Sequence, residues 1–148
     1  MSTISLRSAT VADYPRLIEV WEASVRTTHD FLAEQDLQAL KPLIFNQYLD
    51  AVCLTLACSE QGDITGFSGV ADDNIEMLFI APDYRGQGIG TRLLRQAIDQ
   101  QGATSVDVNE QNHAALSFYR ARGFGIGGRS PLDGQGKPYP LLHLQLNA

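Results

Sequence analysis

A glycine-rich loop between a predicted strand and a predicted helix is the feature that most constrains the fold of this chain. The apolar run 75–81 ends at Pro82, which cannot donate to a β-ladder, so the run predicts a strand that stops there. Three glycines follow at alternate positions in 86–90, and apolar residues then recur at helical spacing in 89–98. The sequence therefore predicts a strand, a short glycine-rich turn and a helix.

Such a loop indicates a binding site for a phosphate group. Glycines leave the backbone N–H groups unshielded, and the first turn of a helix carries unpaired N–H donors and the positive end of the helix dipole. A P-loop requires a lysine after the glycines, and none follows here. A dinucleotide fingerprint requires a third glycine where Thr91 stands. A glycine-rich turn that binds no ligand is the alternative.

Length and composition limit the architecture and the partners. The 148 residues suit one domain, 1–148, and 44% hydrophobic with 19% charged residues indicates a globular chain. A net charge of −6 argues against a nucleic-acid partner. Cys53 and Cys58, about 16 Å apart in one predicted strand, are too distant for a disulfide, and we expect two buried thiols. Free thiols and the lack of a signal-peptide pattern predict a cytoplasmic protein. The lack of a long apolar run predicts that it has no membrane partner.

The remaining chain alternates between strand and helix patterns. Thr10 to Asp13 has the form of a capping box before a helical pattern that includes Trp21, which is expected in the core. Pro42 is expected to split or kink a second helical region, 33–50. The order β-α-α-β-β-β-α-β-α-β-β predicts a mixed sheet with helices on both faces. Strands are expected at 4–7, 52–58, 64–71, 75–81, 105–109, 124–129 and 139–146, and helices at 14–25, 33–50, 89–101 and 112–122.

Two motifs resemble those of the GCN5-related N-acetyltransferase (GNAT) family. The segment Arg85-Gly86-Gln87-Gly88-Ile89-Gly90, preceded by Leu78-Phe79-Ile80-Ala81-Pro82, resembles the pyrophosphate loop Arg/Gln-x-x-Gly-x-Gly/Ala. Asn112 to Phe124 resembles the segment Asn-x-x-Ala-x-x-Phe-Tyr-x-x-x-Gly-Phe. The stretches 28–32 and 136–142 further resemble a YjaB-type subgroup of bacterial lysine acetyltransferases. The resemblance covers essentially the whole chain and implies an acyltransferase sheet of about seven mostly antiparallel strands, splayed between its fourth and fifth strands.

The resemblance implies acetyl-CoA as the acetyl donor, bound in the gap between those two strands. Its pantetheine arm is expected to pair with main-chain groups of Leu78, Phe79 and Ile80, and an N–H near Phe79 is expected to hold the thioester carbonyl and stabilise the oxyanion. Asn112 is implied to bond to the pantetheine, with the N-cap of the next helix as its alternative role; both can hold. The pyrophosphate is expected on the loop formed by Arg85, Gly86, Gln87, Gly88, Ile89, Gly90 and Thr91.

The resemblance also assigns a proton donor. Tyr119 is implied to protonate the departing thiolate, and a purely structural core tyrosine is the alternative. Phe118 is expected to face elsewhere, because adjacent helical positions diverge. Neither cysteine falls within a motif, which favours direct attack by an amine in a ternary complex over an acyl-cysteine route.

A carboxylate is needed to remove the proton of an ammonium acceptor, and the family usually takes it from the central strands. Glu76 and Asp107 are the candidates, with Glu76 ranked slightly first. Glu76 is expected on the same side of its strand as Leu78 and Ile80, by the two-residue period. A structural or solvent-exposed role is the alternative for each acid.

The acceptor itself is less defined by the sequence. His29 and Asp30, between the first two helices, lie where the family forms its acceptor site, and Tyr139 faces the same region by resemblance. The amine could be a protein lysine, a protein N-terminus or a small molecule, and the protein a monomer or a homodimer. His113 and His143 have no partners at ligand spacing, so no metal is predicted. A non-catalytic acyl-CoA sensor or interaction module on the same fold is the alternative function.

Overall fold

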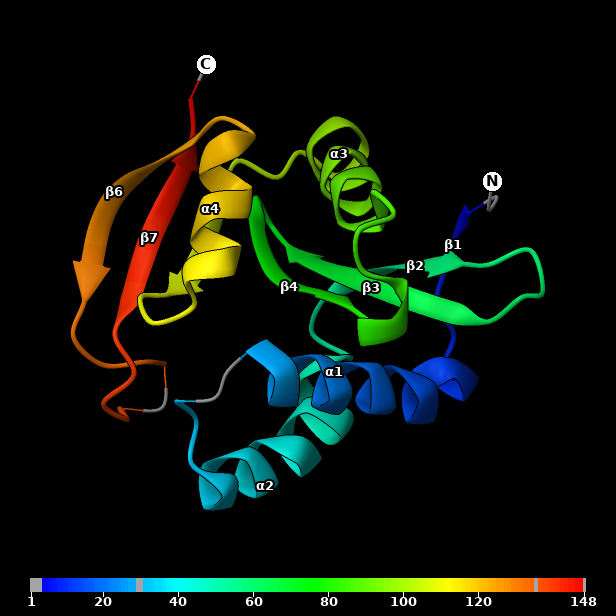
Figure 1. The fold of residues 1–148 in the computed structure, drawn as a ribbon, viewed down its shortest axis with the longest axis horizontal. Helices are drawn as coiled ribbons and strands as arrows, with labels where there is room; N and C mark the ends of the chain where they lie inside the picture. Colours follow the sequence, from blue (N-terminus) through cyan, green and yellow to red (C-terminus); the bar gives the residue numbers. More distant parts are fainter. Residues whose placement is uncertain (1–3, 29–30, 135, 148) are drawn as a thin grey trace.

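The computed structural model describes residues 4–28, 31–134 and 136–147. Its strands form a seven-stranded sheet in the order β1-β2-β3-β4-β5-β7-β6 (Figure 1). The pair β4–β5 is parallel and the other neighbours are antiparallel, so the predicted mixed sheet is confirmed. In the described ranges, no helix has the length and apolar character needed to cross a membrane. The elements are β1 (Ser5–Ser8), α1 (Tyr14–Thr28), α2 (Glu34–Leu43), β2 (Cys53–Cys58), β3 (Ile64–Ala71), β4 (Asn74–Ile80), α3 (Ile89–Gln101), β5 (Ser105–Asn109), α4 (His113–Ala121), β6 (Phe124–Ser130) and β7 (Leu141–Leu146).

Helices cover both faces of the sheet, as the element order predicts. α1 and α2 pack on one face of β2–β4, where Trp21, Phe67 and Met77 belong to one buried cluster. α3 and α4 pack on the opposite face, where Leu94 and Val106 belong to a second cluster. Burial of Trp21 confirms that it is a core residue.

Among the described residues, a helix covers the C-terminal strands on one face and leaves the other face without a helix. Val108, Leu142 and Leu144 are buried in the cluster that includes α4. Asp107 on β5 and His143 on β7 alternate with these residues, and their side chains are 43% and 38% exposed. We call this side of β5 and β7, which carries Asp107 and His143, the open face.

Two local expectations need correction. Pro42 does not split its helix: it lies inside α2, which passes directly into the π-helical turn Ile44–Tyr48. A proline removes one backbone donor near the end of a helix, and here a change of helix type follows in place of a break. Cys58 is buried as expected, but Cys53 is exposed because it begins the strand β2.

Asp13 joins the first strand to the first helix. Its carboxylate accepts from the Thr10 N–H (2.9 Å), which is the predicted capping-box contact, and from both terminal nitrogens of Arg7 (3.0 Å each). A 3-10 turn, Val11–Asp13, separates this cap from α1. The Arg7 guanidinium, followed by the Thr10 amide, lowers the pKa of the Asp13 carboxyl from 3.8 to about 2.

Replacing Asp13→Asn is expected to lower the free energy of unfolding by about 1 kcal/mol at pH 7, because the ion pair with Arg7 is lost. The folded-state pKa is depressed, so the contribution is complete above the ordinary aspartate pKa and disappears as pH falls toward about 2. Urea unfolding of both proteins between pH 3 and 7 measures this. Glu19→Gln, at an exposed ion pair with Arg16, is the control. An Asp13→Asn deficit that stays constant over this range would contradict the assignment.

Candidate active site

The sheet opens between β4 and β5. Their ladder contains the pairs Asn74↔Ser105 and Ile75↔Val106, after which both fully described strands continue without pairing to each other. Ser105 Oγ donates to Asn74 Oδ1 (2.8 Å), and the Asp73 carbonyl accepts from the Ser105 N–H (3.2 Å), so this end is closed firmly. The predicted splay between the fourth and fifth strands is confirmed.

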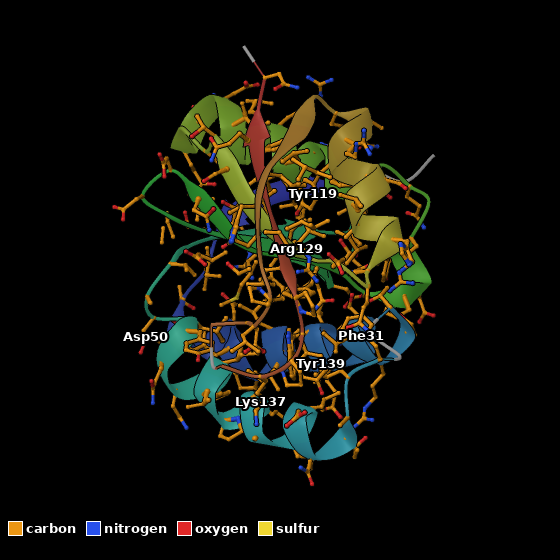
Figure 2. All side chains as sticks on the ribbon, turned by 90° about the vertical axis from the view of Figure 1, so that its left-hand side faces the viewer. Phe31, Asp50, Tyr119, Arg129, Lys137 and Tyr139 are labelled. Atoms are coloured by element: carbon orange, nitrogen blue, oxygen red, sulfur yellow. The ribbon has the colours of Figure 1, made fainter. Side chains whose placement is uncertain are left out.

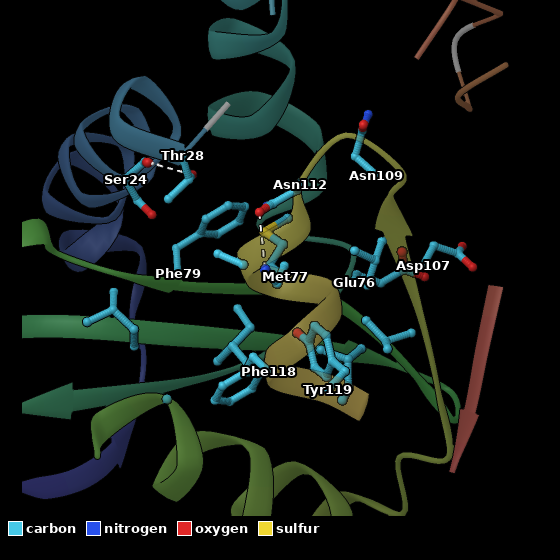
Figure 3. A pocket seen from close by; sticks show the side chains of 18 of the residues that line it. Ser24, Thr28, Glu76, Met77, Phe79, Asp107, Asn109, Asn112, Phe118 and Tyr119 are labelled. Carbon is cyan, nitrogen blue, oxygen red and sulfur yellow. Dashed lines mark hydrogen bonds between the residues drawn. The ribbon is translucent and has the colours of Figure 1, made fainter. Parts of the chain in front are cut away.

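A cavity of about 330 Å³ occupies this opening (Figure 3). β4, β5, α1 and α4 all contribute to its walls. Leu78, Phe79 and Ile80 line it, so the strand edge expected to bind a ligand does face an open space. The cavity reaches the glycine loop at Arg85 and Gly90, which places the strand gap and the loop in one continuous site.

The loop backbone requires glycine at two positions. Gly86 and Gly88 have φ of 77° and 79°, in the left-handed region, and a Cβ at either would meet no atom within 4 Å. The first hydrogen bond of α3 in this region runs from the Arg92 N–H to the Gly88 carbonyl (3.1 Å). The N–H groups before Arg92 in the first turn therefore have no acceptor within the helix, as a phosphate site needs.

Side chains of the loop are tied to neighbouring helices. Arg85 Nη2 donates to Thr27 Oγ1 (2.6 Å) at the end of α1, where a cation also suits the helix dipole. Thr91 Oγ1 accepts from Arg122 Nε (3.0 Å), and the Arg122 guanidinium lies 3.9 Å from the centre of the Phe118 ring. These contacts hold the loop in place and leave its backbone to face an anion.

Tyr119 lies at the base of the cavity. It is buried, and its ring contacts those of Phe118 and Phe124 edge-on, with centroids 5.1 Å and 5.5 Å away. Burial raises the pKa of the Tyr119 phenol. No residue in the described part of the chain forms a hydrogen bond with its hydroxyl, which points into the cavity in Figure 3. The group is therefore a protonated phenol available to a ligand.

Phe118 also lines the cavity, so the expectation that it faces elsewhere was wrong. The cavity extends around α4 from the strand gap to the glycine loop, and adjacent helical positions reach different parts of it. A Cβ at Gly90 would lie 3.4 Å from the Phe118 ring, an ordinary contact distance, so the packing of α4 near α3 does not itself require glycine there.

Asn112 caps α4. Its side-chain oxygen accepts from the Ala115 N–H (3.1 Å), which confirms the N-cap role. The residue is nearly buried and lines the cavity, so contact with a ligand remains a prediction for the same side chain.

Glu76 and Asp107 flank the point where the strands separate, one residue beyond the last ladder pair (Figure 3). Both are exposed and both line the cavity. Glu76 is the extra residue of a bulge, because Met77 and Ile75 pair with consecutive residues of β3. The two-residue period is interrupted there, so alternation no longer supports the expectation that Glu76 shares a side with Leu78 and Ile80.

His143 has partners that the sequence did not reveal. Its Nδ1 lies 2.6 Å from Asp107 Oδ1, and its Nε2 lies 2.6 Å from Ser130 Oγ. Alternation with Leu142 and Leu144 in β7 predicts the face on which His143 lies. No short sequence pattern predicts how β7 aligns with β5, which is what places His143 opposite Asp107. From the sequence, His143 was considered only as a metal ligand, and these two hydrogen-bond partners were not anticipated.

The described part of the chain places none of the residues expected on the acceptor side in the cavity. His29 and Asp30 lie outside the described residues. Tyr139 is not among the residues that line the cavity: its hydroxyl donates to Asp36 Oδ2 (2.5 Å) and accepts from the Ala33 N–H (3.2 Å). Figure 2 places Tyr139 beside Phe31, above α2.

Two cavity residues of α1 were missed. Ser24 and Thr28 line the cavity, and the Thr28 hydroxyl donates to the Ser24 carbonyl (2.8 Å) (Figure 3). Their spacing of four places them on one side of the helix. A buried serine on an otherwise apolar helix face was the available signal.

Comparisons with known proteins agree with this geometry. Residues 51–126 match the family model described as "Acetyltransferase (GNAT) domain". Peptidyl-lysine N-acetyltransferase YjaB of Salmonella typhimurium is 39% identical over 141 residues, 95% of this chain and 97% of the relative. The solution structure of apo-form YjaB from Escherichia coli superposes with a TM-score of 0.89 at 37% identity, covering 97% of each chain. PaiA N-acetyltransferase of Thermoplasma acidophilum in complex with coenzyme A shares the fold, with a TM-score of 0.77 at 20% identity over 98% of this chain and 99% of that one.

Replacing Gly88→Ala is expected to lower the free energy of unfolding by about 1–2 kcal/mol, because alanine resists the left-handed conformation. Gly88→Asn is expected to cost less, since asparagine tolerates this region. Gly134→Ala is the matched control, because a Cβ there also meets open space and its φ is not left-handed. Urea unfolding checks all three variants. Equal losses in Gly88→Ala and Gly134→Ala would show that the loop does not constrain the backbone as described.

Proposed function

Because the chain belongs to the GNAT family of acetyltransferases, we propose that it moves the acetyl group of acetyl-CoA to a primary amine by direct attack in a ternary complex. The opening between β4 and β5 carries this proposal. It brings an unpaired strand edge, the first turn of α3 and the hydroxyl of Tyr119 into one cavity. The strand edge can bind the arm that carries the thioester, the first turn of α3 can bind a diphosphate, and the Tyr119 hydroxyl can protonate a leaving thiolate.

The donor half of the site is assigned to backbone groups. Main-chain N–H and C=O groups of Leu78, Phe79 and Ile80 would pair with the pantetheine amides as a strand does, and a backbone N–H near Phe79 would hold the thioester carbonyl. The volume of the cavity suits an acetyl-pantetheine arm, and the nucleotide would lie beyond the glycine loop. The coenzyme A complex of the similarly folded PaiA supports a donor of this class.

Tyr119 supplies the proton for the leaving group. Burial raises the pKa of its phenol, so the hydroxyl stays protonated at neutral pH. Such a group can donate to a thiolate as the carbon–sulfur bond breaks. The absence of a hydrogen-bond partner within the described residues supports this use over a role in anchoring the helix.

The acceptor is assigned to the side of the cavity that carries Glu76 and Asp107. Two exposed carboxylates there favour a cationic ammonium, which must lose a proton before it attacks. The relatives named peptidyl-lysine N-acetyltransferase support a protein lysine as that amine. A small-molecule amine fits the same chemistry, and His29, Asp30 and Tyr139 stay predictions for the surrounding surface.

Two measurements test the proposal. Calorimetry with coenzyme A should give heat of binding, and acetyl-CoA should release free thiol when mixed with a panel of lysine peptides, N-terminal peptides and small amines. Binding without thiol release for any amine would favour an acyl-CoA sensor. No binding by the well-folded protein would reject the donor site.

Replacing Tyr119→Phe is expected to lower kcat by about 10²–10⁴-fold while leaving the KM for acetyl-CoA nearly unchanged, because only the proton donor is removed. Thermal stability should change little, since the hydroxyl bonds to no described residue. Steady-state thiol release and a melting curve check this. Tyr84→Phe, outside the cavity lining, is the control. A wild-type kcat in Tyr119→Phe would make this tyrosine structural.

A further inference from the structure

Three polar side chains form a row across the open face. The imidazole of His143 lies in the middle of the row. Its Nε2 is 2.6 Å from Ser130 Oγ, and its Nδ1 is 2.6 Å from Asp107 Oδ1. The residues come from the adjacent strands β6, β7 and β5, and the ladder sets His143 directly opposite Asp107. Asp107 also lines the cavity, so the row begins at the cavity and runs away from it.

The donors and acceptors in this row follow from its chemistry. A carboxylate only accepts, so Nδ1 of His143 carries the hydrogen that Asp107 receives. In the neutral ring Nε2 is then an acceptor, and the Ser130 hydroxyl donates to it. Asp107, which can only accept, therefore selects this tautomer, and the Ser130 hydroxyl adapts to it because it can donate or accept. Ser130 is not among the residues that line the cavity, so we assign it no covalent role.

The two acids beside the cavity differ in how they are held. Asp107 is fixed by His143 through Oδ1, while no described residue donates to its Oδ2. The Glu76 carboxylate forms no hydrogen bond or ion pair with any residue that the structure describes, and Glu76 is the extra residue of a bulge. A carboxylate already fixed in one rotamer loses less conformational freedom when it binds a cation.

We propose that His143 and Ser130 position Asp107 so that Asp107, and not Glu76, binds the acceptor ammonium and accepts its proton. The inference rests on the acetyl transfer proposed above. His143 and Ser130 act through Asp107, so they are positioning residues, and Asp107 is the catalytic residue.

The proton balance is simple. Asp107 forms an O–H bond as one N–H bond of the ammonium breaks. The free amine then bonds to the acetyl carbon to give an oxyanion, and the carbon–sulfur bond breaks as the carbonyl re-forms. Tyr119 gives its hydroxyl proton to the thiolate and takes the second proton that the new amide nitrogen loses. Asp107 returns its proton to water, and the net products are the amide, the free thiol and one proton.

The kinetic test compares His143→Ala with His143→Asn. Asparagine places an amide nitrogen near the position of Nδ1, so it can still donate to Asp107, while alanine cannot. His143→Ala is expected to lower kcat/KM for the amine by about 10- to 100-fold, since a hydrogen bond to a charged group is lost, with the KM for acetyl-CoA unchanged. His143→Asn should recover most of the loss. His113→Ala, on the exposed end of α4, is the matched control.

A double-mutant cycle tests whether His143 works through Asp107. Asp107→Asn should lower kcat/KM more than Glu76→Gln does, and adding His143→Ala to Asp107→Asn should cause little further loss. Additive losses of kcat/KM in the double mutant would overturn the proposal. So would a His143→Asn variant as slow as His143→Ala, or a loss in Glu76→Gln larger than that in Asp107→Asn.

A binding measurement keeps this inference separate from the transfer reaction. Nα-acetyl-lysine methylamide, added to the protein loaded with coenzyme A, should shift the imidazole NMR signals of His143 in the wild type and not in Asp107→Asn. The norleucine analogue, which lacks the ammonium, is the control ligand. Wild-type signals that do not move with the lysine analogue would overturn the inference, whether or not the protein turns over. Shifts without thiol release would support this ammonium site and contradict the proposed transfer.

Discussion

The short ladder between β4 and β5 is the constraint on which the rest of the site depends. Its two pairs, with the side-chain bond between Asn74 and Ser105, hold the strands together at one end and fix where they separate. If the ladder continued, Leu78–Ile80 would bond to β5 and no cavity would lie next to Tyr119. Backbone donors and acceptors at a strand edge need partners. The opening therefore creates both the space and the groups that a strand-like ligand uses.

Much of the fold could be predicted because its signals are local. Pro82 stops a strand, Gly102 adopts φ of 71° to end α3, and the capping box at Asp13 marks the approach to α1. The glycine loop was predicted for the same reason, since Gly88 is required by the conformation of its own backbone. Elements whose limits are set by such residues lie within a few positions of their predicted limits.

Contacts between distant residues could not be read from the sequence. His143 and Asp107 are 36 residues apart, and their contact depends on the register of β5 with β7. The side of Glu76 could not be argued from alternation, because a bulge interrupts the two-residue period at that residue. Tyr139 was expected to face the acceptor site, but its hydroxyl bonds to Asp36, 103 residues away, and it does not line the cavity. Packing of whole elements decides these contacts, and no short pattern encodes it.

The contact between the last loop and α2 affects how a ligand enters the site. Lys137 Nζ lies 3.2 Å from Asp36, and Tyr139 bonds to the same carboxylate; Tyr139 and Lys137 lower the pKa of Asp36. This joins the C-terminal strands to the α1–α2 layer, as the Asn74–Ser105 bond joins the two parts of the sheet elsewhere. The opening between β4 and β5 is thus bordered by polar contacts at two separate places, which favour one separation of the strands. A site that is preformed in this way loses little binding free energy to rearrangement of the protein when the ligand binds.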